Sequence, residues 1–182
     1  MHAGPRTPWD TVAADDEHHA AAGDEATAAG VFVDELVFSS RIGLEHKDEL
    51  ERLLFFNGNQ ARVVDGVAFV VQQFGIPRIR SEAGSLRIAL ASGRESQTLF
   101  VLDRGELGDD LVGVVVYLRD ADALVALFVA VHEEYAIAGQ RGERNLTLRI
   151  LDELKAIGRR VKGVRELRVF LGRRTPARLT LG

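Results

Sequence analysis

The sequence contains no cysteine, and it has only one methionine, one tryptophan and four prolines among its 182 residues. Without cysteine there is no disulfide framework, no thiol nucleophile and no thiolate metal site. No apolar run approaches the ~18 residues of a membrane-spanning helix. The N-terminal region also lacks a basic segment followed by an apolar one. We therefore expect neither secretion nor a membrane association, and predict a cytoplasmic protein.

Charge is unevenly distributed along the chain, although the net charge is only −4. Residues 1–30 hold six acids against one arginine, whereas residues 155–178 hold nine bases against one acid. The first segment is also rich in alanine, glycine and proline, which is typical of disorder. We predict a disordered acidic tail over residues 1–30 and one folded domain over residues 31–182. The Asp and His run at residues 15–19 is not preorganised in such a tail, so no metal site is predicted.

The first half of the folded domain gives a mixed pattern. Residues 31–38 are suited to a strand, and residues 45–55 to a helix with acids in its first turn. Residues 61–74 fit either a second helix or, over residues 67–71, a strand, because periodicity does not decide between them. The Gly75-Ile76-Pro77 sequence ends that segment in both cases.

The second half has a clearer order of elements. Strands are predicted over residues 86–91, 98–102, 111–118 and 124–131, with turns at residues 103–110 and 119–122. An amphipathic helix is predicted over residues 145–161, ended by Gly163, and a strand over residues 167–171 that runs parallel to residues 124–131. Residues 175–181 offer one more strand, with pairing across a homodimer interface as an alternative. These elements predict an α/β fold of the α+β type: a mixed, mostly antiparallel central sheet flanked by helices.

Three segments carry a resemblance to a known family. The run Asp110 to Val116 is similar to the third strand of the GCN5-related N-acetyltransferases. The run Leu127 to Tyr135 is similar to their fourth strand, and the loop Gly139 to Asn145 occupies the place of their pyrophosphate loop. The resemblance covers roughly residues 97–171 and implies an acyl-CoA N-acyltransferase-like fold. It also implies a function, the transfer of an acetyl group from acetyl-CoA to an amine on a small molecule or a protein.

The chemistry of the loop can be argued from its residues. A glycine-containing turn before a helix exposes backbone N–H groups at the positive end of the helix dipole, where phosphate binds. Gly139 and Gly142 would allow close approach, and Arg141 or Arg144 would pair with phosphate. The alternative is a surface loop capped by Asn145.

The resemblance implies acetyl-CoA, or another acyl-CoA, as the cosubstrate, with no metal. In the family, backbone groups of the fourth strand bind the pantetheine arm. The candidate cofactor-binding residues are therefore Val129, Ala130, Val131, Gly139, Gln140, Arg141, Gly142, Arg144 and Asn145. An amine acceptor needs a general base, and His132 and Glu133 are the catalytic candidates. Their alternative is an exposed, solvated strand end.

A second function remains open, a catalytically inactive interaction module with the same fold. Arg141 is bulky where the family has a small residue, and only ten residues follow Gly172, where the family continues with a helix and two strands. Both features favour this alternative. The basic C-terminal segment has Phe170 as its single interleaved aromatic residue, so nucleic-acid binding is not expected.

Overall fold

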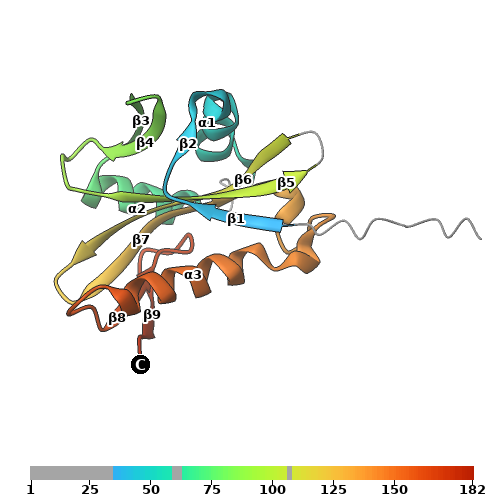
Figure 1. Cartoon of the computed structure of the whole chain (residues 1–182). Coiled ribbons are helices and arrows are strands. Elements are labelled where there is room, and N and C mark those ends of the chain that lie inside the picture. Colours follow the sequence, from blue (N-terminus) through green and yellow to red (C-terminus); the bar gives the residue numbers. More distant parts are fainter. Residues whose placement is uncertain (1–34, 59–62, 106–107) are drawn as a thin grey trace, which may run out of the picture. The chain divides into compact units, whose positions relative to one another are not determined.

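A six-stranded mixed sheet organises the computed structural model, which describes residues 35–58, 63–105 and 108–182 (Figure 1). Only β7 and β8 are parallel, and all other neighbouring strands are antiparallel. The predicted α+β class with a mixed, mostly antiparallel sheet is therefore confirmed. The predicted tail and the run at residues 15–19 lie outside the described residues. The strands, in sheet order, are β1 (Glu35–Ser39), β5 (Gln97–Gly105), β6 (Gly108–Asp120), β7 (Ala123–Val131), β8 (Glu166–Val169) and β9 (Ala177–Thr180).

A second, three-stranded antiparallel sheet has the order β2 (Ile42–Gly43), β4 (Ser85–Leu90) and β3 (Pro77–Glu82). Strand β4 agrees with the strand predicted over residues 86–91, whereas β3 was not predicted. The composition of β3 explains this, because charged and polar residues dominate it and Ile79 is its one strand former. Its pairing with β4 is what holds it in the extended conformation, and its charged side chains suit an edge strand.

Helices cover both faces of the large sheet (Figure 1). On one face, α1 (Lys47–Phe55), which follows a short 3-10 turn, and α2 (Val64–Phe74) contribute to a core cluster that includes Phe100 and Val114. The ambiguous segment is thus helical over its described part. On the other face, α3 (Leu146–Arg160) buries Leu146, Ile150 and Leu154, one residue per turn. Within the described residues, no helix is both long enough and apolar enough to cross a bilayer.

The predicted turn at residues 103–110 is wrong in its extent. Asp103 pairs with Asp110, and Arg104 with Asp109, so these four residues lie in β5 and β6. Both strands are longer than predicted because β1 pairs with β5 as far as Arg104, so that backbone hydrogen bonds outweigh the low strand propensity of aspartate.

The last two strands, β8 and β9, complete the large sheet. The strand predicted near the C-terminus is β9, and it pairs antiparallel with β8 of the same chain. The strand predicted after α3 is β8, and it runs parallel to β7 as expected for a crossover through a helix.

Candidate functional site

The parallel pair β7 and β8 separates halfway along β7. The nine residues of β7 run from Ala123 to Val131, but β8 pairs only with residues 123–126. The last backbone contact across the pair runs from the Phe170 N–H to the Ala126 carbonyl, at 3.0 Å. Beyond Ala126, β7 therefore has an edge that β8 does not cover.

A β-bulge lies at the point where this edge begins. Val116 pairs with Phe128 and Tyr117 with Ala126, so Leu127 is an extra residue in β7. The N–H of His132 bonds to the Val112 carbonyl at 2.8 Å, which fixes the alternation of the backbone groups that follow the bulge.

Two of the three cofactor candidates in β7 face the uncovered edge. By this alternation, Ala130 directs its backbone groups to β6, whereas Val129 and Val131 direct theirs to the side of β8. The Val131 carbonyl accepts a hydrogen bond from Asn57 Nδ2 at 2.7 Å, which agrees with that direction. Among the described residues, none pairs with the backbone groups of Val129 on this side. We call the backbone groups of Val129 and the N–H of Val131 the free edge.

The loop between β7 and α3 forms two short 3-10 turns, over Glu133–Tyr135 and Gly142–Arg144. Most of its N–H groups are bonded within the loop itself. The Arg141 N–H bonds to the Glu134 carbonyl at 2.7 Å, and the Asn145 N–H bonds to the Gly142 carbonyl at 3.1 Å. The N–H groups of three further candidates, Gly139, Gly142 and Arg144, are bonded to the carbonyls of Ala136, Gly139 and Arg141.

The two glycines of this loop allow its own backbone to approach closely. A Cβ atom added to Gly139 would lie 2.3 Å from the Glu133 carbonyl oxygen, and one added to Gly142 would lie 2.6 Å from that of Ile137. Asn145 is in the left-handed region with φ of 50°, and its side chain donates to the Glu143 carbonyl at 2.9 Å rather than capping α3. The alternative of a surface loop capped by the Asn145 side chain is therefore wrong in that contact.

Both candidate arginines of the loop contact a buried carboxylate. Arg141 Nη1 and Arg144 Nη1 lie 2.8 and 2.7 Å from Asp103 Oδ2, and the Tyr135 hydroxyl donates to the same oxygen. Burial, followed by the hydrogen bond to Asp103, raises the pKa of Tyr135 above its ordinary value. We call these four residues the Asp103 cluster. The cluster was not predicted, because the sequence pattern placed Asp103 in a turn.

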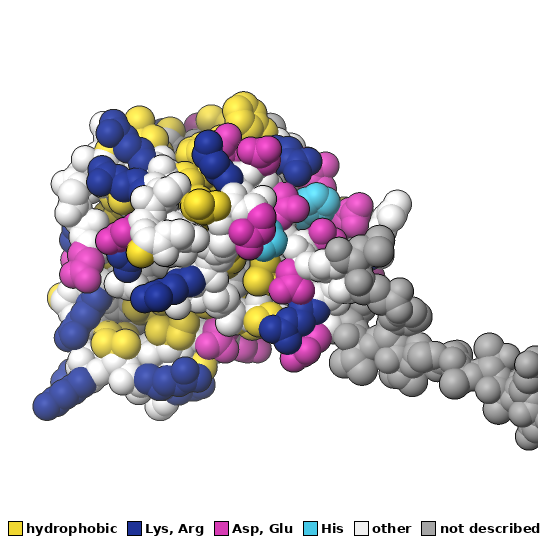
Figure 2. Space-filling model, turned by 45° about the horizontal axis from the view of Figure 1, so that its top comes forward, with side chains coloured by type: hydrophobic (Ala, Val, Ile, Leu, Met, Phe, Trp, Pro, Cys, Tyr) yellow, Lys and Arg dark blue, Asp and Glu magenta, His cyan; other side chains and the backbone are white. Residues whose placement is uncertain are grey.

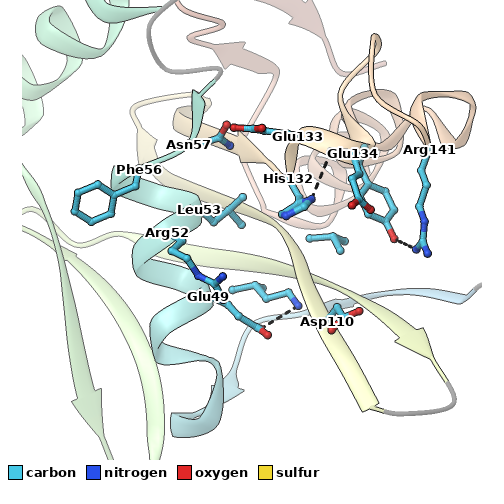
Figure 3. Close-up of a pocket in the computed structure, with 13 residues that line it drawn as sticks. Glu49, Arg52, Leu53, Phe56, Asn57, Asp110, His132, Glu133, Glu134 and Arg141 are labelled. Atoms are coloured by element: carbon cyan, nitrogen blue, oxygen red, sulfur yellow. Dashed lines mark hydrogen bonds between the residues drawn. The ribbon is translucent and has the colours of Figure 1, made fainter.

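A cavity of about 560 Å³ opens between α1 and the end of β7 (Figure 3). This volume is within the range of small-molecule sites. Both catalytic candidates, His132 and Glu133, line it, and so does Arg141 from the loop. We call it the β7 cavity. Its remaining lining residues are Glu49, Arg52, Leu53, Phe56, Asn57, Asp110, Leu111, Val112, Glu134 and Tyr135.

Hydrogen bonds hold the catalytic candidates in place. Glu133 Oε1 accepts the Gly58 N–H at 2.8 Å, and in Figure 3 its carboxylate lies beside Asn57. His132 Nδ1 accepts the Glu134 N–H at 3.4 Å. The strand ends at Val131 and a 3-10 turn follows, so Glu133 and Glu134 both line the cavity although they are adjacent in sequence.

Helix α1 supplies a wall of the cavity that the sequence analysis did not assign to any site. Glu49 Oε2 accepts the Leu111 N–H at 3.2 Å, and Phe56 is 78% exposed at the end of the helix. The feature of the sequence that could have indicated this wall is the aromatic pair Phe55-Phe56, directly before Asn57-Gly58. Figure 2 shows that Asp and Glu side chains gather around the histidines on this side, while Lys and Arg side chains dominate the opposite edge.

The chemistry available in the β7 cavity is that of proton transfer and recognition of cations. Carboxylates of Glu49, Asp110, Glu133 and Glu134 and the imidazole of His132 share one space with two guanidinium groups. Comparison of the chain with models of known families, with curated proteins and with solved structures finds no match. Function is therefore inferred from the free edge, the loop and the β7 cavity themselves.

Proposed function

We propose that this chain is an acyl-CoA-dependent N-acyltransferase related to the GCN5-related N-acetyltransferases. The observation that carries the proposal is the free edge of β7, next to the bulge at Leu127. A pantetheine arm contains two amides, and these can pair with the backbone of an exposed strand as a peptide does in β-augmentation. The Val129 N–H and carbonyl are directed to the side where such an arm would lie.

The β7 cavity would receive the amine acceptor. Asn57 lines the cavity and bonds to Val131, so the cavity begins where the free edge ends. In this proposal Glu133 or His132 takes a proton from the ammonium group, which makes the nitrogen nucleophilic. The amine then attacks the thioester carbonyl, the C–S bond breaks as the amide bond forms, and the departing thiolate of CoA takes up the second proton of the nitrogen.

The pyrophosphate is the part of the cosubstrate that the loop suits least. Five of the seven N–H groups from Gly139 to Asn145 are bonded within the loop, and Asp103 contacts both arginines. This favours a second candidate function, a catalytically inactive interaction module that keeps the fold. A pyrophosphate bound at this loop would contact two other kinds of group. These are the first backbone N–H groups of α3, which have no partner within the helix, and the Arg141 side chain, which is 46% exposed.

The two functions differ in their response to acetyl-CoA. An acyltransferase should be stabilised by acetyl-CoA or CoA in a concentration-dependent manner. Hydrogen exchange should slow at the amides of Val129 and Val131, whereas the amide of Ala130 is already bonded to β6. Arg141→Glu should reduce the stabilisation, and Arg159→Glu, an exposed residue in the last turn of α3, far from its N-terminus, should not. No stabilisation by either ligand would refute the transferase and leave the interaction module.

A further inference from the structure

A second cavity, of about 160 Å³, lies where the chain passes from the large sheet to the small one. It is bounded by the connection between β1 and β2, by β4 and by the start of β5. We call it the β4–β5 cavity. Its lining residues are Ser40, Arg41, Arg87, Ile88, Ser96, Gln97 and Thr98.

The lining combines hydrogen-bond donors and positive charge. The lining residues include two arginines, three residues with hydroxyls and one glutamine, and no carboxylate is among them. Arginine side chains bind phosphate through paired N–H groups, and hydroxyls donate to the remaining oxygens. The space is well below the ~300 Å³ of ordinary small-molecule pockets, so it accommodates a single group.

Thr98 is the innermost polar residue of this cavity. It is 8% exposed, and it lies on the same face of β5 as Phe100, the face that meets the small sheet. Its hydroxyl makes no hydrogen bond within the described part of the chain. Because Thr98 lines the cavity, this hydroxyl is available to donate to a group bound there.

The mouth of the cavity carries more positive than negative charge. Arg87 Nη1 donates to Glu82 Oε2 at 2.8 Å, and Arg41 has no ion pair within the described residues. The hydrogen bond from Arg87, with the charges of Arg87 and Arg41, holds the pKa of Glu82 below its usual value. Glu82 is 66% exposed, so its carboxylate can turn to solvent when an anion approaches.

We propose that the β4–β5 cavity is an oxyanion site that binds one phosphate group, either free or carried by a small molecule. Arg41 and Arg87 neutralise the charge, and Thr98 donates to an oxygen at the base of the cavity. Binding at this site needs neither acyl-CoA nor the β7 cavity, so it stands apart from the proposed transferase function.

The test is an NMR titration of the full-length, ¹⁵N-labelled chain with inorganic phosphate and with phenyl phosphate, at constant ionic strength. Saturable shifts are expected at the amides of Ser96, Gln97 and Thr98. Loss of one charge-assisted or hydroxyl contact should raise the Kd about tenfold, so Arg87→Gln and Thr98→Val should each do so. The matched control is Arg78→Gln, an exposed arginine of β3 outside the cavity, which should bind as the wild type.

One further variant and a comparison of the two ligands distinguish the possible results of the titration. Thr98→Ser keeps the hydroxyl and should retain binding, so a loss in Thr98→Val alone is not a folding effect. Tighter binding of phenyl phosphate than of phosphate would indicate a phosphorylated small molecule, and the reverse would indicate the free ion. The proposal is overturned if no saturable shifts occur at residues 96–98, if they are confined to residues 139–146, or if Arg87→Gln binds as the wild type.

Discussion

The side-chain amide of Asn57 donates to the carbonyl oxygen of Val131 at 2.7 Å, across 74 residues of sequence. This bond joins the end of α1 to the end of β7, and both residues belong to segments that border the β7 cavity. The neighbouring Gly58 N–H bonds to Glu133. The distance between α1 and the exit of β7 is therefore set by two long-range hydrogen bonds.

Replacement of Asn57 by alanine should lower the free energy of unfolding by about 1 kcal/mol, because a partly buried hydrogen bond is lost. Urea denaturation monitored by circular dichroism measures the change. Ser85→Ala removes a local, exposed hydrogen bond to Glu82 and should cost less than ~0.5 kcal/mol. Equal effects of the two substitutions would contradict a structural role for Asn57.

The Asp103 cluster should be the most sensitive polar site of the chain. Asp103 is 5% exposed and Arg144 10% exposed, so Asp103→Asn removes the charge that both arginines contact in a buried setting. Breaking such a pair typically costs about 3 kcal/mol, and the unfolding midpoint should fall accordingly. Asp152→Asn breaks an exposed pair with Lys155 and should cost ~0.5 kcal/mol or less. A mild effect of Asp103→Asn would show that the cluster is not structural.

Both tyrosines of the chain should titrate above their ordinary pH. Burial raises the pKa of Tyr117, helped by the charge of Glu153, and burial and Asp103 raise the pKa of Tyr135. The change in absorbance at 295 nm should therefore have its midpoint above pH ~10, the ordinary tyrosine pKa. In Tyr117→Phe the remaining signal reports Tyr135 alone, and a titration at or below the ordinary value would contradict the buried hydrogen bond.

The same shifts predict how stability depends on pH. A tyrosine whose folded pKa exceeds its unfolded pKa contributes stability that is complete below the unfolded value, about 10. As pH rises further, the unfolded chain loses the proton first, and the contribution is lost as pH passes through the folded pKa. Urea midpoints measured from pH 8 to 11 should fall at the alkaline end, and less steeply in Tyr135→Phe.

If the chain is a transferase, Glu133→Gln should lower kcat by ~10²-fold or more, because a general base is lost. The Kd for acetyl-CoA should not change, since the amide of glutamine still accepts the Gly58 N–H. The matched control is Glu134→Gln, the adjacent carboxylate of the same cavity, which should retain most of the activity. An equal loss in both variants, or no loss in either, would remove Glu133 from the catalytic role and leave His132 as the candidate.

The strands β5, β6 and β7 and the helix α3 could be predicted because their apolar residues follow the periods of their own elements. The same reasoning did not find β3, whose extended shape depends on pairing with β4. It also placed Asp103 in a turn, because aspartate is rare in strands, whereas β1 and β6 on either side keep β5 extended.

The sequence by itself determined the α+β class, the order of the elements around residues 97–171 and the parallel crossover, since these follow from local periodicity and from the handedness of connections. The tertiary structure alone decided which polar groups meet. Arg144 lies 41 residues after Asp103 and contacts it, and Asn57 lies 74 residues before Val131. Hydrogen bonds of this kind depend on the packing of distant elements, and no periodicity in a single segment records them.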